Sequence, residues 1–506
     1  MSKIFSSAII GLDAQLIEVE ANVGGGVGGV FIIVGLPDMA VKESKERIWS
    51  AIKNSGLSFP RSKIVVNLAP ADIRKEGPAY DLPMALSVLC AAGKIEFKDR
   101  DKKAVYAGEL SLDGHLRSIN GALSMTLMAK EKGMERIFVP QANAYEASLV
   151  GGVEIMPVSR LIELVEHLKG IKLIEPYKNS LIEIEERVDN NIDMAFIKGQ
   201  EQAKRALEIA ASAGHNVLLS GPPGSGKTLL ARAVTTILPK MSHNEILEVT
   251  KIYSVAGKIS KDKSLITNRP FRCPHHTASG VSLVGGGTFP RPGEISLAHR
   301  GILFLDEFSE FPRMVLENLR QPLEDGIITV SRAQGTVTFP ARFTLIASQN
   351  PCPCGYYSDP DRNCTCNAGQ IIKYQKKISG PLLDRIDLHI EVPRVKFDKL
   401  TSDELAEKSE NIRQRVEKAR EIQRSRFMNL NISTNAEMSN KEIKNFCLID
   451  SQSQDLLKNA VQQLYLSARS YYRILKVART IADLSEAKKI EPIHVAEALQ
   501  YRARID

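Results

Sequence analysis

The sequence predicts an α/β fold in which a parallel sheet carries a nucleotide-binding loop. Three apolar runs support this prediction. The run 217–220 leads into a glycine-rich turn and an Ala/Leu-rich segment. The run 301–305 is followed by two acidic residues, and the run 343–348 is a third short apolar stretch. Short, uninterrupted apolar runs are typical of strands buried on both faces of a parallel sheet.

The glycine-rich turn has the spacing of a phosphate-binding loop (P-loop). It consists of Gly221, Pro222, Pro223, Gly224, Ser225, Gly226, Lys227 and Thr228. Glycines let backbone N–H groups face phosphate oxygens, and the following helix adds its positive N-terminal end. We expect Lys227 to reach the β- and γ-phosphates and Thr228 to hold Mg²⁺. A Gly/Pro turn without function is the alternative, which the flanking strand and helix disfavour.

Asp306 and Glu307 follow the run 301–305 directly. Ligands of open α/β sheets bind at the carboxyl ends of the strands. There, Asp306 supplies an oxygen for Mg²⁺, directly or through water, and Glu307 supplies a general base or orienting acceptor for the attacking water. Strands often end in acids at the protein surface, but after a P-loop this pair predicts Mg²⁺-dependent ATP hydrolysis.

Composition sets broad limits on the protein. The 506 residues suffice for about three domains, and 43% hydrophobic with 25% charged residues is ordinary for a soluble globular protein. No apolar stretch is long enough to span a bilayer and no signal peptide is recognised, which predicts a cytoplasmic protein without a membrane partner. The net charge of +8 permits a nucleic-acid partner without indicating one.

The pattern along the chain predicts four regions. They are an alternating strand and helix region at 1–170, a charged linker at 171–192, an ATPase core at 193–395 and a helical region at 396–506. Within the first region we expect strands at 63–67 and 137–140 and a helix at 82–92.

Three strings, at 271–279, 285–294 and 379–387, are long and distinctive. They resemble the magnesium-chelatase-like ComM/YifB family of the AAA+ superfamily, and the resemblance extends over essentially the whole chain. It implies an AAA+ P-loop core with an α-helical lid, assembled as an ATP-driven homo-hexamer. It also implies a branch-migration helicase that acts on single-stranded or branched DNA, with recombination proteins, during natural transformation. The P-loop alone does not predict that activity.

The resemblance assigns further roles in the ATPase core. Asn350, after the run 343–348, resembles sensor 1, a polar group that orients the attacking water or contacts the γ-phosphate. An Asn that turns the chain before Pro351 is the alternative. The segment 197–200 resembles the one that packs on adenine.

Arginines complete the catalytic set that the resemblance implies. Arg385 resembles the arginine finger, a rigid planar cation supplied to the ATP of a neighbouring subunit. Its alternative is an ion pair with Asp384 or Asp387. Arg469 resembles sensor 2, and Arg473, one helical turn further, is the other candidate.

The segment 272–300 is rich in glycine, proline, arginine and histidine, and we expect it to be too glycine-rich for a packed core element. The resemblance implies an insert that enters the central pore of the ring. Its candidates for DNA phosphates are Arg272, His275, His276 and Arg291, and structural histidines are the alternative. The runs 327–330 and 336–339 predict a β-hairpin, for which the resemblance implies a pore position with Arg332 near DNA.

Four cysteines lie in the loop 350–367. They form two C-x-C pairs separated by nine residues, Cys352 with Cys354 and Cys364 with Cys366. Four thiols this close suit a tetrahedral Zn²⁺ site, although the C-x-C spacing is tighter than usual. Free or redox-active thiols are the alternative.

The strings 75–79, 108–114 and 119–123 resemble the Lon-protease-type α+β domain of the ribosomal-S5 domain-2 superfamily. Where Lon proteases carry the nucleophilic serine and the lysine, this chain has Ala79 and Leu123. Neither side chain can attack a carbonyl or take a proton, which predicts a domain without peptidase activity. DNA binding or organisation of the ring is the expected role.

Two other functions stay open at the level of sequence. One is a chelatase-type motor that remodels a protein partner or assists metal insertion into a tetrapyrrole. The resemblance counts against it, because magnesium-chelatase motors lack a Lon-like domain. The other is a nucleotide-dependent scaffold, which the intact acids Asp306 and Glu307 disfavour.

Overall fold

The structure is a computed structural model, and two compact units make it up. The described residues are 3–24, 29–178, 192–259, 265–287, 290–332, 335–357, 359, 361–395, 406–464 and 466–502. The first unit comprises Met1–Ile184 with His243–Ile266, and the second comprises Glu185–Ser242 with Thr267–Asp506. Within the described ranges, every helix is too short or too polar to cross a bilayer.

A seven-stranded mixed sheet forms the centre of the first unit, in the order β3-β4-β2-β1-β5-β8-β9. Its strands are β1 (Ile4–Ile10), β2 (Asp13–Gly24), β3 (Phe31–Val34), β4 (Lys63–Ala69), β5 (Ala104–Tyr106), β8 (Arg136–Pro140) and β9 (Glu154–Val158). A separate pair consists of β6 (Glu109–Leu110) and β7 (Leu116–Arg117). The strands predicted at 63–67 and 137–140 are confirmed as β4 and β8.

The helices of the first unit are α1 (Met39–Asn54), α2 (Asp81–Ala91), α3 (Asp99–Lys102), α4 (Ala122–Glu131), α5 (Ala144–Ser148), α6 (Leu161–Lys169) and α9 (His243–Val255). α2 confirms the helix predicted at 82–92 to within one residue at each end. α1 begins after Asp38, whose carboxylate accepts a hydrogen bond from the Val41 N–H at 2.7 Å and so caps the helix.

Helix α9 belongs to the first unit, although its neighbours in sequence belong to the second. Ser254 Oγ accepts a hydrogen bond from the Gly121 N–H at 2.9 Å and also contacts the carboxylate of Glu146. Burial raises the pKa of Glu146, and its hydrogen bond with Ser254 opposes that shift. The sequence analysis predicted a continuous core at 193–395 and did not anticipate that His243–Ile266 belongs to the first unit. The boundaries predicted for the four regions stay predictions.

A five-stranded parallel sheet forms the centre of the second unit, in the order β11-β14-β17-β10-β18. Its strands are β10 (Val217–Ser220), β11 (Phe271–Arg272), β14 (Ile302–Leu305), β17 (Thr344–Gln349) and β18 (Leu388–Glu391). All side chains of β14 are buried, as its apolar run predicts. The expectation of an α/β fold with a parallel sheet is confirmed.

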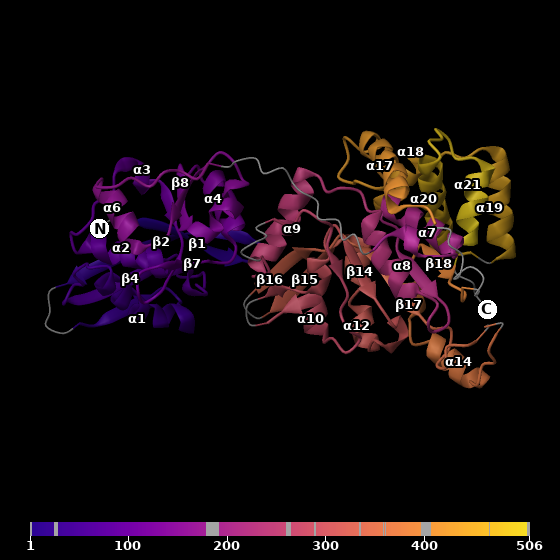
Figure 1. The fold of residues 1–506 in the computed structure, drawn as a ribbon, viewed down its shortest axis with the longest axis horizontal. Coiled ribbons are helices and arrows are strands. Elements are labelled where there is room, and N and C mark those ends of the chain that lie inside the picture. The colour runs from indigo at the N-terminus through magenta and orange to yellow at the C-terminus, as the bar shows by residue number, and fades with distance from the viewer. Residues whose placement is uncertain are drawn as a thin grey trace. The chain divides into compact units, whose positions relative to one another are not determined.

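The second unit contains thirteen described α-helices. They are α7 (Glu201–Ala213), α8 (Lys227–Ala233), α10 (Gly280–Val284), α11 (Glu294–Leu297), α12 (Arg313–Glu317), α13 (Arg320–Asp325), α14 (Ala368–Gln375), α15 (Gly380–Leu383), α17 (Ser409–Arg426), α18 (Asn440–Phe446), α19 (Ser451–Gln463), α20 (Ala468–Leu484) and α21 (Pro492–Gln500). The C-terminal helices α17 to α21 gather beside α7, which α17 and α20 contact directly (Figure 1).

The later part of the glycine-rich segment 272–300 is packed, so the expectation that the segment is no packed core element is wrong for the described residues from 283 onward. α10 and α11 contribute Leu283, Ile295 and Leu297, which are all buried. The strands β12 (Gly285–Gly286) and β13 (Arg291–Pro292) pair between them. A Cβ on Gly285 would lie only 2.3 Å from the Arg291 carbonyl oxygen. Glycine therefore permits a close backbone contact here that a side chain would prevent.

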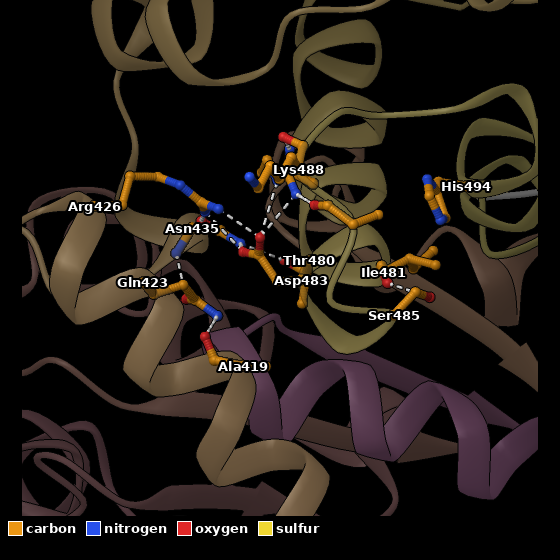
Figure 2. A network of polar contacts seen from close by, with 12 residues as sticks. Ala419, Gln423, Arg426, Asn435, Thr480, Ile481, Asp483, Ser485, Lys488 and His494 are labelled. Carbon is orange, nitrogen blue, oxygen red and sulfur yellow. Dashed lines mark hydrogen bonds and ion pairs between the residues drawn. The ribbon is translucent and has the colours of Figure 1, made fainter.

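A buried network joins the C-terminal helices, as Figure 2 shows. The carboxylate of Asp483 accepts hydrogen bonds from Arg426 (2.7 Å), Arg479 (3.1 Å) and Asn435 Nδ2 (2.8 Å). The Asp483 side chain is 0% exposed and that of Arg479 is 3% exposed. A single buried carboxylate thus balances two guanidinium groups, that of Arg479, which is buried, and that of Arg426, which is partly exposed.

We expect Asp483→Ala to lower the free energy of unfolding of the second unit by about 3–5 kcal/mol, because it leaves a buried guanidinium unpaired. Urea unfolding followed by circular dichroism measures the loss. The sole tryptophan, Trp49, lies in the first unit and reports on that unit in the same experiment. Lys418→Ala, which removes an exposed ion pair with Glu486, is the control and should cost at most about 1 kcal/mol. Equal losses in the two variants would contradict the prediction.

Candidate nucleotide-binding site

The P-loop lysine lies where three adjacent strands of the second unit end. Lys227 is the first residue of α8, directly after β10 and the glycine-rich turn. Its Nζ donates to the carbonyl oxygens of Gly221 (2.8 Å) and Pro222 (2.9 Å) and to Oδ1 of Asn350 (3.3 Å), the residue after β17. The structure therefore brings together two residues that the sequence separates widely.

Thr228 and Asp306 form the second part of the site. The Thr228 hydroxyl donates to Asp306 Oδ2 at 2.9 Å, and the other Asp306 oxygen accepts a hydrogen bond from the Ser348 hydroxyl. A hydroxyl and a carboxylate in contact at a strand end are hard oxygen donors of the kind that Mg²⁺ selects. Sequence reasoning missed Ser348, which is the last residue of the run 343–348.

The backbone of the turn makes a close contact and adopts conformations that favour glycine. A Cβ on Gly221 would lie 2.2 Å from the Val392 carbonyl oxygen, and Gly224 and Gly226 have φ values of 77° and 87°, which favour glycine. Within the described part of the chain, the buried Ser225 hydroxyl has no hydrogen-bond partner. Buried polar atoms are normally paired, so this hydroxyl is suited to a ligand. These features fit a nucleotide with Mg²⁺.

Glu307 has a backbone conformation that few non-glycine residues adopt, with a φ of 53°. Its side chain is 55% exposed, and its carboxylate lies 3.3 Å from Nδ1 of His276. We expected His276 to meet DNA phosphates, but here it lies beside the acid at the end of β14. Strained backbone of this kind is concentrated at functional sites.

Gln200 also contacts the P-loop. Its side-chain amide donates to the backbone carbonyl of Ser225 and to that of Pro393 at 3.2 Å. The sequence placed the segment 197–200 near adenine only by resemblance. The structure brings its last residue to the glycine-rich turn.

The three candidate arginines have other partners. Arg385 pairs with Glu324 and donates to the Pro381 carbonyl at 2.6 Å, and Arg469 lies 3.1 Å from the same glutamate. Arg473 lies 3.6 Å from Asp384 and donates to the Ile386 carbonyl. Among the described residues, none of these arginines contacts the P-loop, and Arg385 forms no ion pair with Asp384 or Asp387.

The other candidates have mixed placements. Arg272 makes two hydrogen bonds with Glu294, at 2.6 and 2.8 Å, so an acid already balances its charge. Arg291 is exposed.

The predicted hairpin is confirmed as β15 (Ile327–Arg332) and β16 (Gly335–Pro340), but the side chain of Arg332 lies outside the described part. Sulfur atoms of the four loop cysteines lie within 4.8 Å of one another.

Burial lowers the pKa of Lys227 to about 8, and the charge of Asp306 opposes that shift. Bound phosphates would raise this pKa toward its ordinary value, so above about pH 8 binding must take up a proton. We expect the affinity for ATP to be steady below that pH and to fall by up to about tenfold per pH unit above it. Calorimetry in buffers of different ionisation enthalpy measures both effects. Flat affinity with no proton uptake would contradict the prediction.

Curated relatives share the full length of the chain. It is 41% identical over 507 residues to competence protein ComM of Haemophilus influenzae, covering 99% of this chain and 97% of that protein. It is 42% identical over 506 residues to the uncharacterized protein YifB of Escherichia coli, with the same coverage. The chain belongs to the ComM/YifB family of magnesium-chelatase-like proteins. The resemblance seen in the sequence strings is thereby confirmed.

Family models describe the same relationship. The model "Magnesium chelatase, subunit ChlI" matches residues 193–400, "Subunit ChlI of Mg-chelatase" matches 19–143 and "Magnesium chelatase, subunit ChlI C-terminal" matches 406–502. The magnesium-chelatase subunit ChlI of Porphyra purpurea is 25% identical over 244 residues, which cover 44% of this chain and 62% of that protein. Full-length similarity therefore belongs to the ComM/YifB relatives, and the chelatase subunit shares about half of the chain.

Proposed function

We propose that this protein is a Mg²⁺-dependent AAA+ ATPase that forms a homo-hexamer and drives branch migration of DNA in recombination or natural transformation. Its place of action is the cytoplasm. The observation that carries the ATPase proposal is a pair of hydrogen bonds at the ends of three adjacent parallel strands. Lys227 donates to Asn350, and Thr228 donates to Asp306. Full-length similarity to a competence protein supports the DNA substrate.

Each residue has one role in this proposal. Lys227 and the P-loop backbone bind the β- and γ-phosphates, and Thr228 and Asp306 hold Mg²⁺, which neutralises phosphate charge when bound. Glu307 accepts a proton from the attacking water or orients it, and Asn350 fixes the position of the γ-phosphate. Arg385 reaches the nucleotide of the neighbouring subunit, and Arg469 or Arg473 acts from the helical lid at 396–506.

The N-terminal domain at 1–170 has no peptidase role in this proposal, and its Lon-like fold serves to organise the ring or to bind DNA. Leu123, at the position of the Lon lysine, is 0% exposed on α4. Ala79 is partly buried and packs against an apolar cluster of the first unit. Two apolar, packed side chains support a structural role for these positions.

A chelatase-type motor is the second candidate. It would remodel a protein partner or assist metal insertion, and the descriptions of the matching family models favour it. The partial coverage of the chelatase subunits counts against it, because ComM and YifB match the chain from end to end and the chelatase subunit does not.

The test is an ATPase assay of the full chain without DNA and with single-stranded, duplex or four-way-junction DNA, together with strand-exchange of a labelled junction. We expect junction DNA to stimulate hydrolysis and to be migrated only with ATP and Mg²⁺. Light scattering with nucleotide should give the mass of six chains. Stimulation by a protein partner but by none of the DNAs would favour the second candidate, and a monomer with nucleotide bound would contradict the ring.

A further inference from the structure

The loop between β17 and α14 gathers four cysteine sulfurs into one cluster. Cys352 Sγ lies 3.3 Å from that of Cys354 and 3.7 Å from that of Cys364, and the Cys354 and Cys364 sulfurs are 3.5 Å apart. The sulfur of Cys366 also lies within 4.8 Å of the others. Sulfurs joined in a disulfide are about 2.05 Å apart, so all four thiols are free in this arrangement.

These separations suit a single metal ion. Four thiolates at the usual Zn–S distance of about 2.3 Å define a tetrahedron with edges of about 3.8 Å. The Cys354 N–H also donates to the Cys366 sulfur at 3.4 Å, and hydrogen bonds of this kind hold metal-binding sulfurs in place. We propose that Cys352, Cys354, Cys364 and Cys366 bind one Zn²⁺ ion that fixes this loop against the P-loop.

The loop touches the nucleotide-binding turn directly. A Cβ added to Gly355 would lie 2.5 Å from Cδ of Pro223, so the loop backbone lies against the proline ring of the P-loop. Gly355 lies between the two sulfur pairs, and Cys352 follows Asn350 by two residues. A metal at the four thiols therefore anchors both a neighbour of the P-loop and the segment that carries Asn350.

Other side chains of the loop add to this attachment. The Tyr356 ring lies 4.2 Å from the guanidinium carbon of Arg362 and 5.3 Å from that of Arg394. Arg394 also pairs with Asp359 at 3.4 Å. Arg394 follows Pro393, whose carbonyl accepts the Gln200 hydrogen bond, so the loop is attached to the exit of β18 as well. A cation–π pair is weak when exposed, so the metal would act together with the ion pair of Arg394 and Asp359 to hold the loop.

Four protein sulfurs fill a tetrahedral coordination shell, so this Zn²⁺ has no open position for substrate and is structural. The Zn²⁺ would affect ATP hydrolysis by holding the loop, and with it Asn350, in position beside the P-loop. Only this effect on hydrolysis rests on the proposed function. Metal binding itself depends on the four thiols alone.

The first measurement is the metal content of the full-length protein purified under reducing conditions. We expect one zinc per chain, and replacement by Co²⁺ should give the thiolate charge-transfer and tetrahedral d–d bands without any substitution in the protein. The double variant Cys364→Ser/Cys366→Ser should lose the metal, whereas Cys90→Ser and Cys273→Ser should keep it. Free thiols without metal, disulfides by mass spectrometry, or metal retained in the double variant would overturn the site.

The second measurement separates positioning from metal binding. Gly355→Ala keeps all four thiols, but its added Cβ meets Pro223 and its φ of 85° is unfavourable for alanine. Displacement of an active-site group by about 1 Å can cost about 100-fold in rate. We therefore expect one zinc per chain with hydrolysis lowered by about tenfold or more. The metal-free wild-type chain, shown to be folded by circular dichroism, should have the same defect. Unchanged hydrolysis in both would overturn the positioning role, and inactive wild-type protein with one zinc would instead count against the ATPase proposal.

Discussion

Glu307→Gln should lower the turnover number for ATP hydrolysis by about 10²–10⁴-fold, the usual contribution of a general base. The amide keeps the size of the side chain but cannot accept a proton. ATP affinity should be nearly unchanged, because the described contacts of Glu307 are with its own segment and His276, and none is with the P-loop. Phosphate release measures turnover, and equilibrium binding of a fluorescent nucleotide measures affinity.

A matched variant, Glu310→Gln, separates the loss of the proposed base from the loss of one negative charge. Glu310 lies three residues further along, and its carboxylate pairs with Lys377 at 3.1 Å. Glu310→Gln removes the same charge from the same surface and should hydrolyse ATP at nearly the wild-type rate. Retained turnover in Glu307→Gln would remove its assigned role. Loss of nucleotide binding would mean that Glu307 shapes the site instead of acting on water.

Arg385→Ala should lower the turnover number by about 10³–10⁵-fold, the range measured for arginine fingers. The cation meets charge that develops on the transferred phosphoryl group, so the loss should fall mainly on the turnover number. Within one chain, Arg385 pairs with Glu324 and not with the residues around Lys227. We therefore propose that Arg385 acts on the nucleotide of another subunit. Lys441→Ala, which removes an exposed cation of α18, is the control and should be silent.

Mixing of two inactive variants tests action between subunits. Lys227→Ala lacks the nucleotide site but keeps Arg385, and Arg385→Ala keeps the site but lacks the finger. In mixed rings, some subunit interfaces combine the intact nucleotide site of an Arg385→Ala chain with the intact Arg385 of a Lys227→Ala chain, so hydrolysis should reappear. Each variant alone should stay inactive. Full activity of Arg385→Ala, or no recovery in rings shown to be mixed, would contradict the role of this arginine in a neighbouring site.

Local patterns predicted β10, β14 and β17 of the five-stranded sheet, and the P-loop, because their information lies in adjacent residues. The apolar run of β14 and the glycine spacing of 221–228 are visible without any tertiary contact. The distinctive strings likewise indicated the family. By contrast, glycine content misled the expectation for 272–300, because glycine permits close packing as well as loops.

Other features of the site depend on which distant segments meet. Ser348 contacts Asp306, His276 contacts Glu307, and Arg385 shares Glu324 with Arg469 across long intervals of sequence. Periodicity specifies which face of an element is apolar but not which segment covers it, as the placement of α9 in the first unit also illustrates.

The sequence by itself determined which groups are available to this protein: a P-loop lysine, a hydroxyl and a carboxylate that we propose to hold Mg²⁺, an acid that we propose to act on water, and four thiols close together in the chain. Only the tertiary structure decided that the cysteine loop lies against Pro223, through the contact of Gly355, and that Lys227 is buried enough to lower its pKa. The physical reason is that residue type and spacing are local properties. Burial and contact depend on the return of remote segments to the same place.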